Sequence, residues 1–173
     1  MTLLTWSDAL ALELPEMDDT HREFVDLLAA VVQADDTGLL SAWEQLIDHT
    51  DGHFGREDDW MRRTGFSSSN CHSTQHQVVL QVMREGLRRG QVNADLALVR
   101  QMADELGSWF PQHAQTMDAA LALHLRGIGF DPATGTVHLP QALPAGEIHG
   151  CGGATCSPAT ESEERATEAA ATA

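Results

Sequence analysis

Lysine and tyrosine are absent from this sequence, and all 10 of its basic side chains are arginines. Acidic residues outnumber them, so the formal net charge is −16. A chain with this charge is repelled by the phosphates of nucleic acids and by anionic membrane surfaces. We therefore expect neither a nucleic acid nor a membrane as a partner.

Long apolar runs are also missing. The longest stretches, such as LLAAVV at residues 27–32, are far shorter than the roughly 20 residues that span a bilayer. The first residues lack a basic segment and carry acids early, so they do not resemble a secretory signal. A cytoplasmic location is the resulting expectation.

Cysteine is rare, with 3 residues in the chain. Cys71 stands alone and is expected to be a small core or boundary residue. Cys151 and Cys156 lie in the glycine-rich stretch IHGCGGATC, where they could form a redox-sensitive disulfide or a weak metal site. The alternative is an unstructured extension whose cysteines have no role.

Composition changes sharply near residue 130. Before this point apolar residues recur at helical spacing, whereas the later residues are rich in Pro, Gly, Ala, Thr and Glu without a sustained period. Such a segment has too little apolar surface to offset the entropy lost on ordering. We therefore expect one domain over residues 1–130 and a mostly disordered or loosely docked tail over residues 131–173.

Four amphipathic segments precede the tail. The first runs from about Asp18, where Asp18 or Asp19 is the expected cap, to Gln33, and the second covers about 37–65. The third follows the polar cluster at 67–70 and ends near Gly90, and the fourth covers about 93–126. These segments predict an all-α fold, an antiparallel up-down-up-down four-helix bundle with an N-terminal arm. Pro111 is expected to bend the fourth helix.

Every predicted helix places histidine on its inward stripe, and two helices add a carboxylate. A single histidine on an apolar face is usually a hydrogen-bonded core residue. Several of them in one core, where unpaired polar groups are costly, favour metal binding instead. The candidate metal ligands are His21, His53, Glu57, His72, His76, His113 and Asp118.

The spacing of these residues indicates how they act together. His72 with His76, and His53 with Glu57, are four residues apart and share one face of a helix. His113 and Asp118 are five apart, about 140° on an ideal α-helix, so they should not bind as a same-face pair. Asp118 could still bridge from the side.

The whole set suits two octahedral ions better than one tetrahedral ion. Imidazole with bridging carboxylate suits iron, and zinc, manganese and copper accept the same ligand types.

On these residues the sequence resembles the bacterial hemerythrins, over about residues 4–130. The matching elements are the arm with Trp6, MDDTH ending at His21, HFGRED with His53 and Glu57, the His72/His76 pair, and WFPQHAQTMD with His113 and Asp118. The resemblance implies a four-helix bundle with a non-haem di-iron centre that binds dioxygen reversibly. The protein would be an oxygen carrier, store or supplier and not an enzyme.

The resemblance also implies a role for each site residue. His72, His76 and His113 would bind one iron, and His21 and His53 the other, which keeps an open position, while Glu57 and Asp118 would bridge the two. An apolar wall would exclude water from the oxygen pocket. Candidates for this wall, which also serve as ordinary core residues, are Phe24, Leu28, Phe54, Trp109 and Phe110.

Two positions depart from the family pattern. His49 stands where many members have a tyrosine, and we expect it to tune the site from outside the ligand set; the alternative is a partly exposed boundary histidine. Asp58 replaces a glutamate that often follows the bridging one, and it is expected to face solvent.

Two other functions stay open. One is a di-iron oxidase, peroxidase or nitric-oxide-handling enzyme, although such sites usually use more carboxylate ligands. The other is an oxygen or redox sensor that signals through the cysteine-containing tail. The oligomeric state is not set by the sequence, and a monomer is the expectation.

Overall fold

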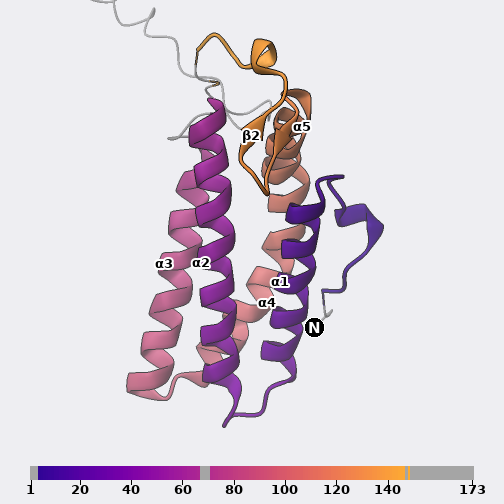
Figure 1. Cartoon of the computed structure of the whole chain (residues 1–173). Coiled ribbons are helices and arrows are strands. Elements are labelled where there is room, and N and C mark those ends of the chain that lie inside the picture. The colour runs from indigo at the N-terminus through magenta and orange to yellow at the C-terminus, as the bar shows by residue number, and fades with distance from the viewer. Residues whose placement is uncertain (1–3, 67–70, 147, 149–173) are drawn as a thin grey trace, which may run out of the picture.

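Long helices that alternate in direction dominate the part of the chain that the computed structural model describes, residues 4–66, 71–146 and 148. The helices are α1 (Pro15–Gln33), α2 (Leu39–Thr64), α3 (Cys71–Asn93) and α4 (Leu96–His113). Around the bundle α1 packs against α2 and α4 (Figure 1). Helix α3 packs against the same two helices from the opposite side. The predicted all-α antiparallel four-helix bundle is confirmed.

The fourth helix of the bundle consists of three consecutive segments. After α4 the backbone passes through a π-helical segment, η2 (Ala114–Asp118), and continues as α5 (Ala119–Gly127). Pro111, at which we expected a bend, lies inside α4, just ahead of this change of helix type. This part of the chain is therefore continuously helical from Leu96 to Gly127, slightly later than the predicted start near residue 93, but it is not one uniform α-helix.

The first helix begins earlier than predicted, at Pro15. Proline is well suited to a first helical position because its missing N–H would have no partner there. The prediction that Asp18 or Asp19 caps this helix is wrong. Asp18 instead lies inside α1, where its buried carboxylate accepts a hydrogen bond from the Leu12 amide at 2.7 Å and fastens the N-terminal arm.

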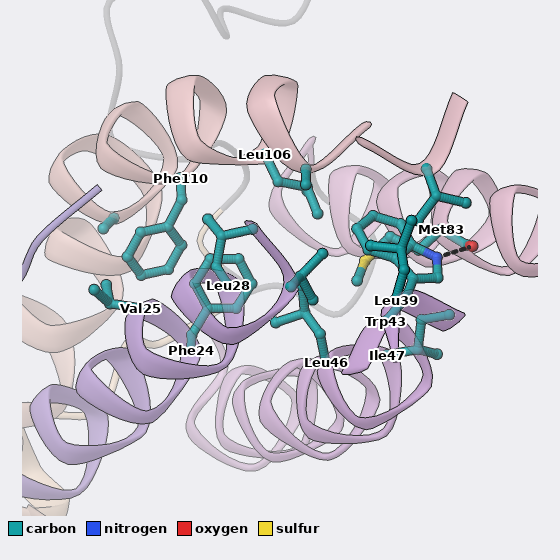
Figure 2. Packing of buried hydrophobic residues seen from close by; sticks show 14 residues of the cluster. Phe24, Val25, Leu28, Leu39, Trp43, Leu46, Ile47, Met83, Leu106 and Phe110 are labelled. Atoms are coloured by element: carbon teal, nitrogen blue, oxygen red, sulfur yellow. Dashed lines mark hydrogen bonds between the residues drawn. The ribbon is translucent and has the colours of Figure 1, made fainter. Parts of the chain in front are cut away.

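Two apolar clusters fill the bundle, one toward each end. The first lies between the four long helices, where the Trp43 indole donates to the Met83 carbonyl at 3.0 Å (Figure 2). The second lies under the arm and α5 and includes Met17, Met61 and Leu121. The polar residues predicted to bind metal occupy the layer between these clusters.

The segment after residue 130 is more ordered than expected in its described part. Strands β1 (Phe130–Asp131) and β2 (Thr136–Val137) pair antiparallel, and a 3-10 turn, η3 (Pro140–Ala142), follows. Phe130 is buried against Trp60, and the Arg63 side chain donates to the Gly135 carbonyl at 2.8 Å. These contacts with α2 supply the apolar burial that the segment lacks by itself.

Cys151, Cys156 and His149 lie outside the described residues, as does the polar cluster at 67–70. Among the described helices, none has a stretch that is both long enough and apolar enough to cross a membrane.

Candidate metal centre

All the predicted metal ligands meet in one buried layer of the bundle. None of the side chains is more than 2% exposed. The residues are His21 from α1, His53 and Glu57 from α2, His72 and His76 from α3, His113 from the end of α4, and Asp118 from η2. Each of the four helices of the bundle therefore contributes at least one polar side chain to this buried layer.

The first of two groups in this layer surrounds the imidazoles of α3 and α4. Glu57 Oε2 lies 3.6 Å from Nε2 of His72 and 3.3 Å from Nε2 of His76. Asp118 Oδ1 lies 2.9 Å from Nε2 of His72 and 3.2 Å from Nε2 of His113. One atom from each of these five residues lies within 4.8 Å of all the others, a separation that suits a single metal ion.

The second group uses the remaining oxygens of the same two carboxylates. Glu57 Oε1 lies 3.0 Å from Nε2 of His53, and Asp118 Oδ2 lies 3.3 Å from Nε2 of His21. The rings of His21 and His53 are 5.0 Å apart, and His21, His53 and Glu57 form a second set whose ligand atoms lie within 4.8 Å of one another. Each carboxylate thus turns one oxygen toward each group.

The π-helical segment explains how Asp118 reaches the site. On an ideal α-helix His113 and Asp118 would point about 140° apart. A π-helix closes its hydrogen bonds between residues five apart, as the bond from the Ala119 amide to the Ala114 carbonyl does here, and this winding brings such residues toward one side. The prediction that His113 and Asp118 cannot share a face is therefore wrong, because the helix is not ideal at this point.

Many polar atoms in this layer lack a hydrogen-bond partner. Among the described residues, these buried atoms are both nitrogens of His21 and of His72, Nδ1 of His53, Oε2 of Glu57, and both oxygens of Asp118. Several lie close to one another, but without hydrogen-bond geometry. An unpaired buried polar atom costs about 1–3 kcal/mol. The Nε2 atoms of His21 and His72 and the carboxylate oxygens in this list therefore fit lone pairs aimed at bound cations better than a structural network.

The electrostatics of the layer favour positive charge. Burial alone would raise the pKa of the Glu57 and Asp118 carboxyls, but the neighbouring histidines hold both well below their usual range. Burial likewise opposes protonation of His72, yet its contacts with Asp118 and Glu57 raise its pKa to about 10. The two carboxylates are therefore ionised and stabilise cations between them.

Two side chains outside the set orient its imidazoles. The Asp58 carboxylate accepts a hydrogen bond from Nδ1 of His76 at 2.9 Å, so the expectation that Asp58 faces only solvent is wrong. The Gln75 carbonyl oxygen accepts from Nδ1 of His113 and from the Trp109 indole, both at 3.3 Å. Such bonds fix the tautomer of each ring and leave Nε2 free to bind metal.

Aromatic rings enclose the layer. Phe54 stacks on His76 at 3.9 Å and Trp109 stacks on His113 at 4.4 Å. On the other side Phe110 meets the His21 ring edge-on at 5.1 Å and stacks on Phe24 at 4.4 Å (Figure 2). Leu28 packs in the same apolar cluster. The predicted wall residues Phe24, Leu28, Phe54 and Phe110 are thus buried, and Trp109 is partly buried against the core. Phe110 borders the group that has fewer candidate ligands.

His49 lies one turn before His53 but outside both groups. Its ring is half-buried and 6.2 Å from that of His53, and Nε2 donates to the Thr20 carbonyl at 3.1 Å. Burial and the neighbouring His53 lower the pKa of His49, which keeps the ring neutral and able to donate this bond. It therefore touches the backbone of α1 immediately before His21.

Comparison with known proteins agrees with this geometry. The family model described as "Hemerythrin HHE cation binding domain" matches residues 13–123, a range that contains all seven site residues. A protein of Ralstonia nicotianae named Bacteriohemerythrin is 37% identical over 131 residues, which cover 76% of this chain and 95% of the relative.

More distant relatives carry the same name. A protein of Stenotrophomonas maltophilia is 25% identical over 126 residues, 70% of this chain and 81% of its own length. One of Pseudomonas paraeruginosa is 24% identical over 123 residues, 69% of this chain and 79% of its own length. No solved structure matches the chain significantly.

Proposed function

We propose that this chain, which belongs to the hemerythrin family, binds dioxygen reversibly at a pair of non-haem iron ions. The observation that carries the proposal is the division of the two carboxylates, each with one oxygen toward each of two imidazole groups. A mononuclear site needs no such arrangement, whereas a dinuclear site needs bridging ligands of this kind.

The ligand roles follow from the grouping. His72, His76 and His113 would hold one iron and His21 and His53 the other, with Glu57 and Asp118 shared between the two. The His21 and His53 group offers one imidazole fewer than the other group, and dioxygen would bind on that side. When bound, a reduced iron pair supplies the electrons that reversible dioxygen binding requires.

The rest of the chain protects and orients this site. Phe110 and Phe24 form an apolar wall beside His21, which keeps water from the open position and slows irreversible oxidation. Asp58 and Gln75 hold His76 and His113 in the tautomer that binds metal. The protein then acts as a carrier or store of oxygen and not as an enzyme, because five imidazole ligands leave little open coordination for catalysis.

His49 has a positioning role in this scheme. Its hydrogen bond to the Thr20 carbonyl ties α2 to α1 at the residue before His21. The bond restrains the backbone that carries an iron ligand beside the open position, which is how a residue outside the ligand set can tune oxygen binding.

The test is a cycle of oxygenation. Protein loaded with ferrous iron without air should bind two iron ions per chain, develop a visible charge-transfer band in oxygen, and lose that band when oxygen is removed. His72→Gln should retain less iron, while the matched control His138→Gln, which changes an exposed histidine, should behave as the unchanged chain. Irreversible oxidation, turnover of a reductant or failure to bind iron would contradict the proposal.

A further inference from the structure

An apolar cavity of about 260 Å³ lies between α3 and α4 and is bordered by residues of the first apolar cluster. Its wall includes Val82 from α3, Met102 and Leu106 from α4, and Trp43 from α2. Trp43 is fully buried and Val82 is 47% exposed, so the cavity runs from the core to the surface. A small molecule can therefore enter it from solvent.

Exposed valines stand at the mouth of the cavity. Val78 and Val82 are one turn apart on α3 and are 54% and 47% exposed. Valine has a lower helix propensity than leucine or glutamine, and at an exposed position it buries little apolar area. An apolar molecule that covers these two side chains removes that area from water, so the mouth favours a ligand with an apolar body.

The inner wall is adaptable because of Gly86 and Met102. A Cβ at Gly86 would overlap the Met102 sulfur, so the glycine leaves room for this flexible side chain. Ligand pockets usually measure roughly 300–1,000 Å³. This cavity is slightly smaller and suits a molecule the size of one ring or a short chain.

Polar groups on the wall are few, and most are already bonded. Among the described residues that line the cavity, nitrogen or oxygen occurs in the side chains of Trp43, Trp109 and Glu105. The Trp43 indole donates to the Met83 carbonyl at 3.0 Å, and the Trp109 indole donates to Gln75 at 3.3 Å (Figure 2). These side chains thus offer no free donor to a carboxylate or phosphate, and their one available polar group is the Glu105 carboxylate.

Glu105 accepts no cation from the part of the chain that the structure describes. Its side chain is exposed and forms no ion pair there, whereas Glu85 on α3 is paired with Arg88. The formal net charge of −16 adds to the attraction of this surface for cations. A positively charged donor is therefore the group that suits the rim of the cavity.

We propose that this cavity binds a small organic ammonium ion, with its ring or chain inside and its charged end on Glu105. The apolar body displaces water from Val78 and Val82, and the ammonium supplies the donor that the carboxylate lacks. A neutral molecule with the same body binds more weakly, and an anion is repelled.

Trp109 connects the cavity to the candidate metal centre. Its ring lines the cavity, stacks on His113 at 4.4 Å and donates to Gln75, which also accepts from Nδ1 of His113. A ligand against Trp109 restrains the side chains that orient His113, and occupancy therefore slows the loss of iron. This consequence rests on the proposed function, whereas binding in the cavity does not.

Calorimetric titration of the full chain with three probes of one apolar body tests the charge preference. The probes are phenethylammonium, phenethyl alcohol and phenylacetate, and each is titrated into the chain with and without iron. Phenethylammonium should bind about fivefold more tightly than the alcohol, the difference that one exposed ion pair supports. Phenylacetate should bind more weakly than either. Equal affinities for the ammonium and the alcohol would overturn the proposal.

Glu105→Gln assigns that preference to one side chain. The change keeps the size of the side chain and removes its charge, so the ammonium should lose its fivefold advantage while the affinity for the alcohol stays unchanged. The matched control is Glu44→Gln, which removes the same charge from an exposed position on α2 outside the cavity. A preference that survives in Glu105→Gln, or that is lost equally in Glu44→Gln, would overturn the role of Glu105.

Val82→Gln tests the place of the apolar body. It should weaken the ammonium and the alcohol alike by about threefold, because less apolar area is covered. Val92→Gln is its control, since Val92 is an exposed valine of α3 that does not line the cavity. The same affinities in both variants would place the ligand elsewhere and overturn the site.

Two further outcomes are decisive. Dimers in sedimentation that Val82→Gln dissociates, together with no binding of phenethylammonium, would assign this face to a second copy of the chain and overturn the proposal. A chain that binds phenethylammonium but retains no iron would contradict the proposed function and support the cavity as a separate site.

Discussion

Replacing Asp58 by alanine removes the carboxylate that accepts a hydrogen bond from Nδ1 of His76 at 2.9 Å. The opposite nitrogen of that ring, Nε2, lies 3.3 Å from Glu57 Oε2 and is the atom proposed to bind iron. Without Asp58 the ring is free to change tautomer or rotate, and its basicity falls. We expect weaker iron binding with little change in the fold.

The magnitude follows from the strength and exposure of the bond. A hydrogen bond to a charged group contributes about 1.5–3 kcal/mol. The Asp58 side chain is 38% exposed, so solvent screens it and the lower part of that range applies. A loss of about 1.5–2 kcal/mol corresponds to roughly 10- to 30-fold weaker metal binding.

Competition with a chelator of known affinity measures this loss. Asp58→Asn keeps a neutral acceptor and should fall between the unchanged chain and Asp58→Ala. Asp59→Ala is the matched control, because Asp59 follows on the same helix and pairs with Arg62 and Arg63. If Asp58→Ala and Asp59→Ala lose the same affinity, the reasoning about His76 fails.

Three further changes test other parts of the account. Phe110→Ala, at a fully buried ring, should lower the free energy of unfolding by about 3–5 kcal/mol in chemical denaturation, and a loss below about 1 kcal/mol would contradict its place in the core. His49→Phe removes a hydrogen bond of about 1 kcal/mol and should change oxygen affinity or oxidation rate about fivefold; no change in either would leave His49 a boundary residue. Burial lowers the pKa of His124 in the folded chain, so its protonation favours the unfolded state and stability falls as pH drops below about 6.5. His124→Gln should reduce this loss, and parallel stability curves for the two proteins between about pH 8 and pH 5 would refute it.

The bundle was predictable because its signal is long and repeated. Apolar residues at helical spacing over four segments leave one common solution, and α1 to α4 appear close to where the pattern puts them. The errors lie at the ends. Pro15 moves the start of α1 ahead of Asp18, since a local steric preference at the first turn outweighs the capping signal.

The sequence predicted which side chains would gather in the candidate site, but it did not predict the residues that orient them. Asp58 touches His76 across two helices, and Gln75 reaches His113 from α3 to α4. Both contacts depend on how far each helix is rotated against its neighbour, which spacing along one helix does not determine. Asp118 was among the predicted ligands, but its approach to the site required the π-helical segment, which the ideal α-helical period does not reveal.

The short strands after α5 show the same limit. Phe130 and Val137 have no period long enough to predict structure, and they are ordered by packing against the end of the bundle. Order of this kind depends on tertiary contact and not on local propensity.

Oxygen stoichiometry tests the central claim most directly. The ferrous, iron-loaded chain is titrated with dissolved oxygen in a closed cell, and the bound gas is then recovered under argon. Reversible binding at a paired iron centre requires uptake of one dioxygen per two iron ions in each chain, with nearly all of it returned as dioxygen and the iron again ferrous. Uptake without release, or one dioxygen consumed per single iron, would contradict reversible binding at a paired iron centre.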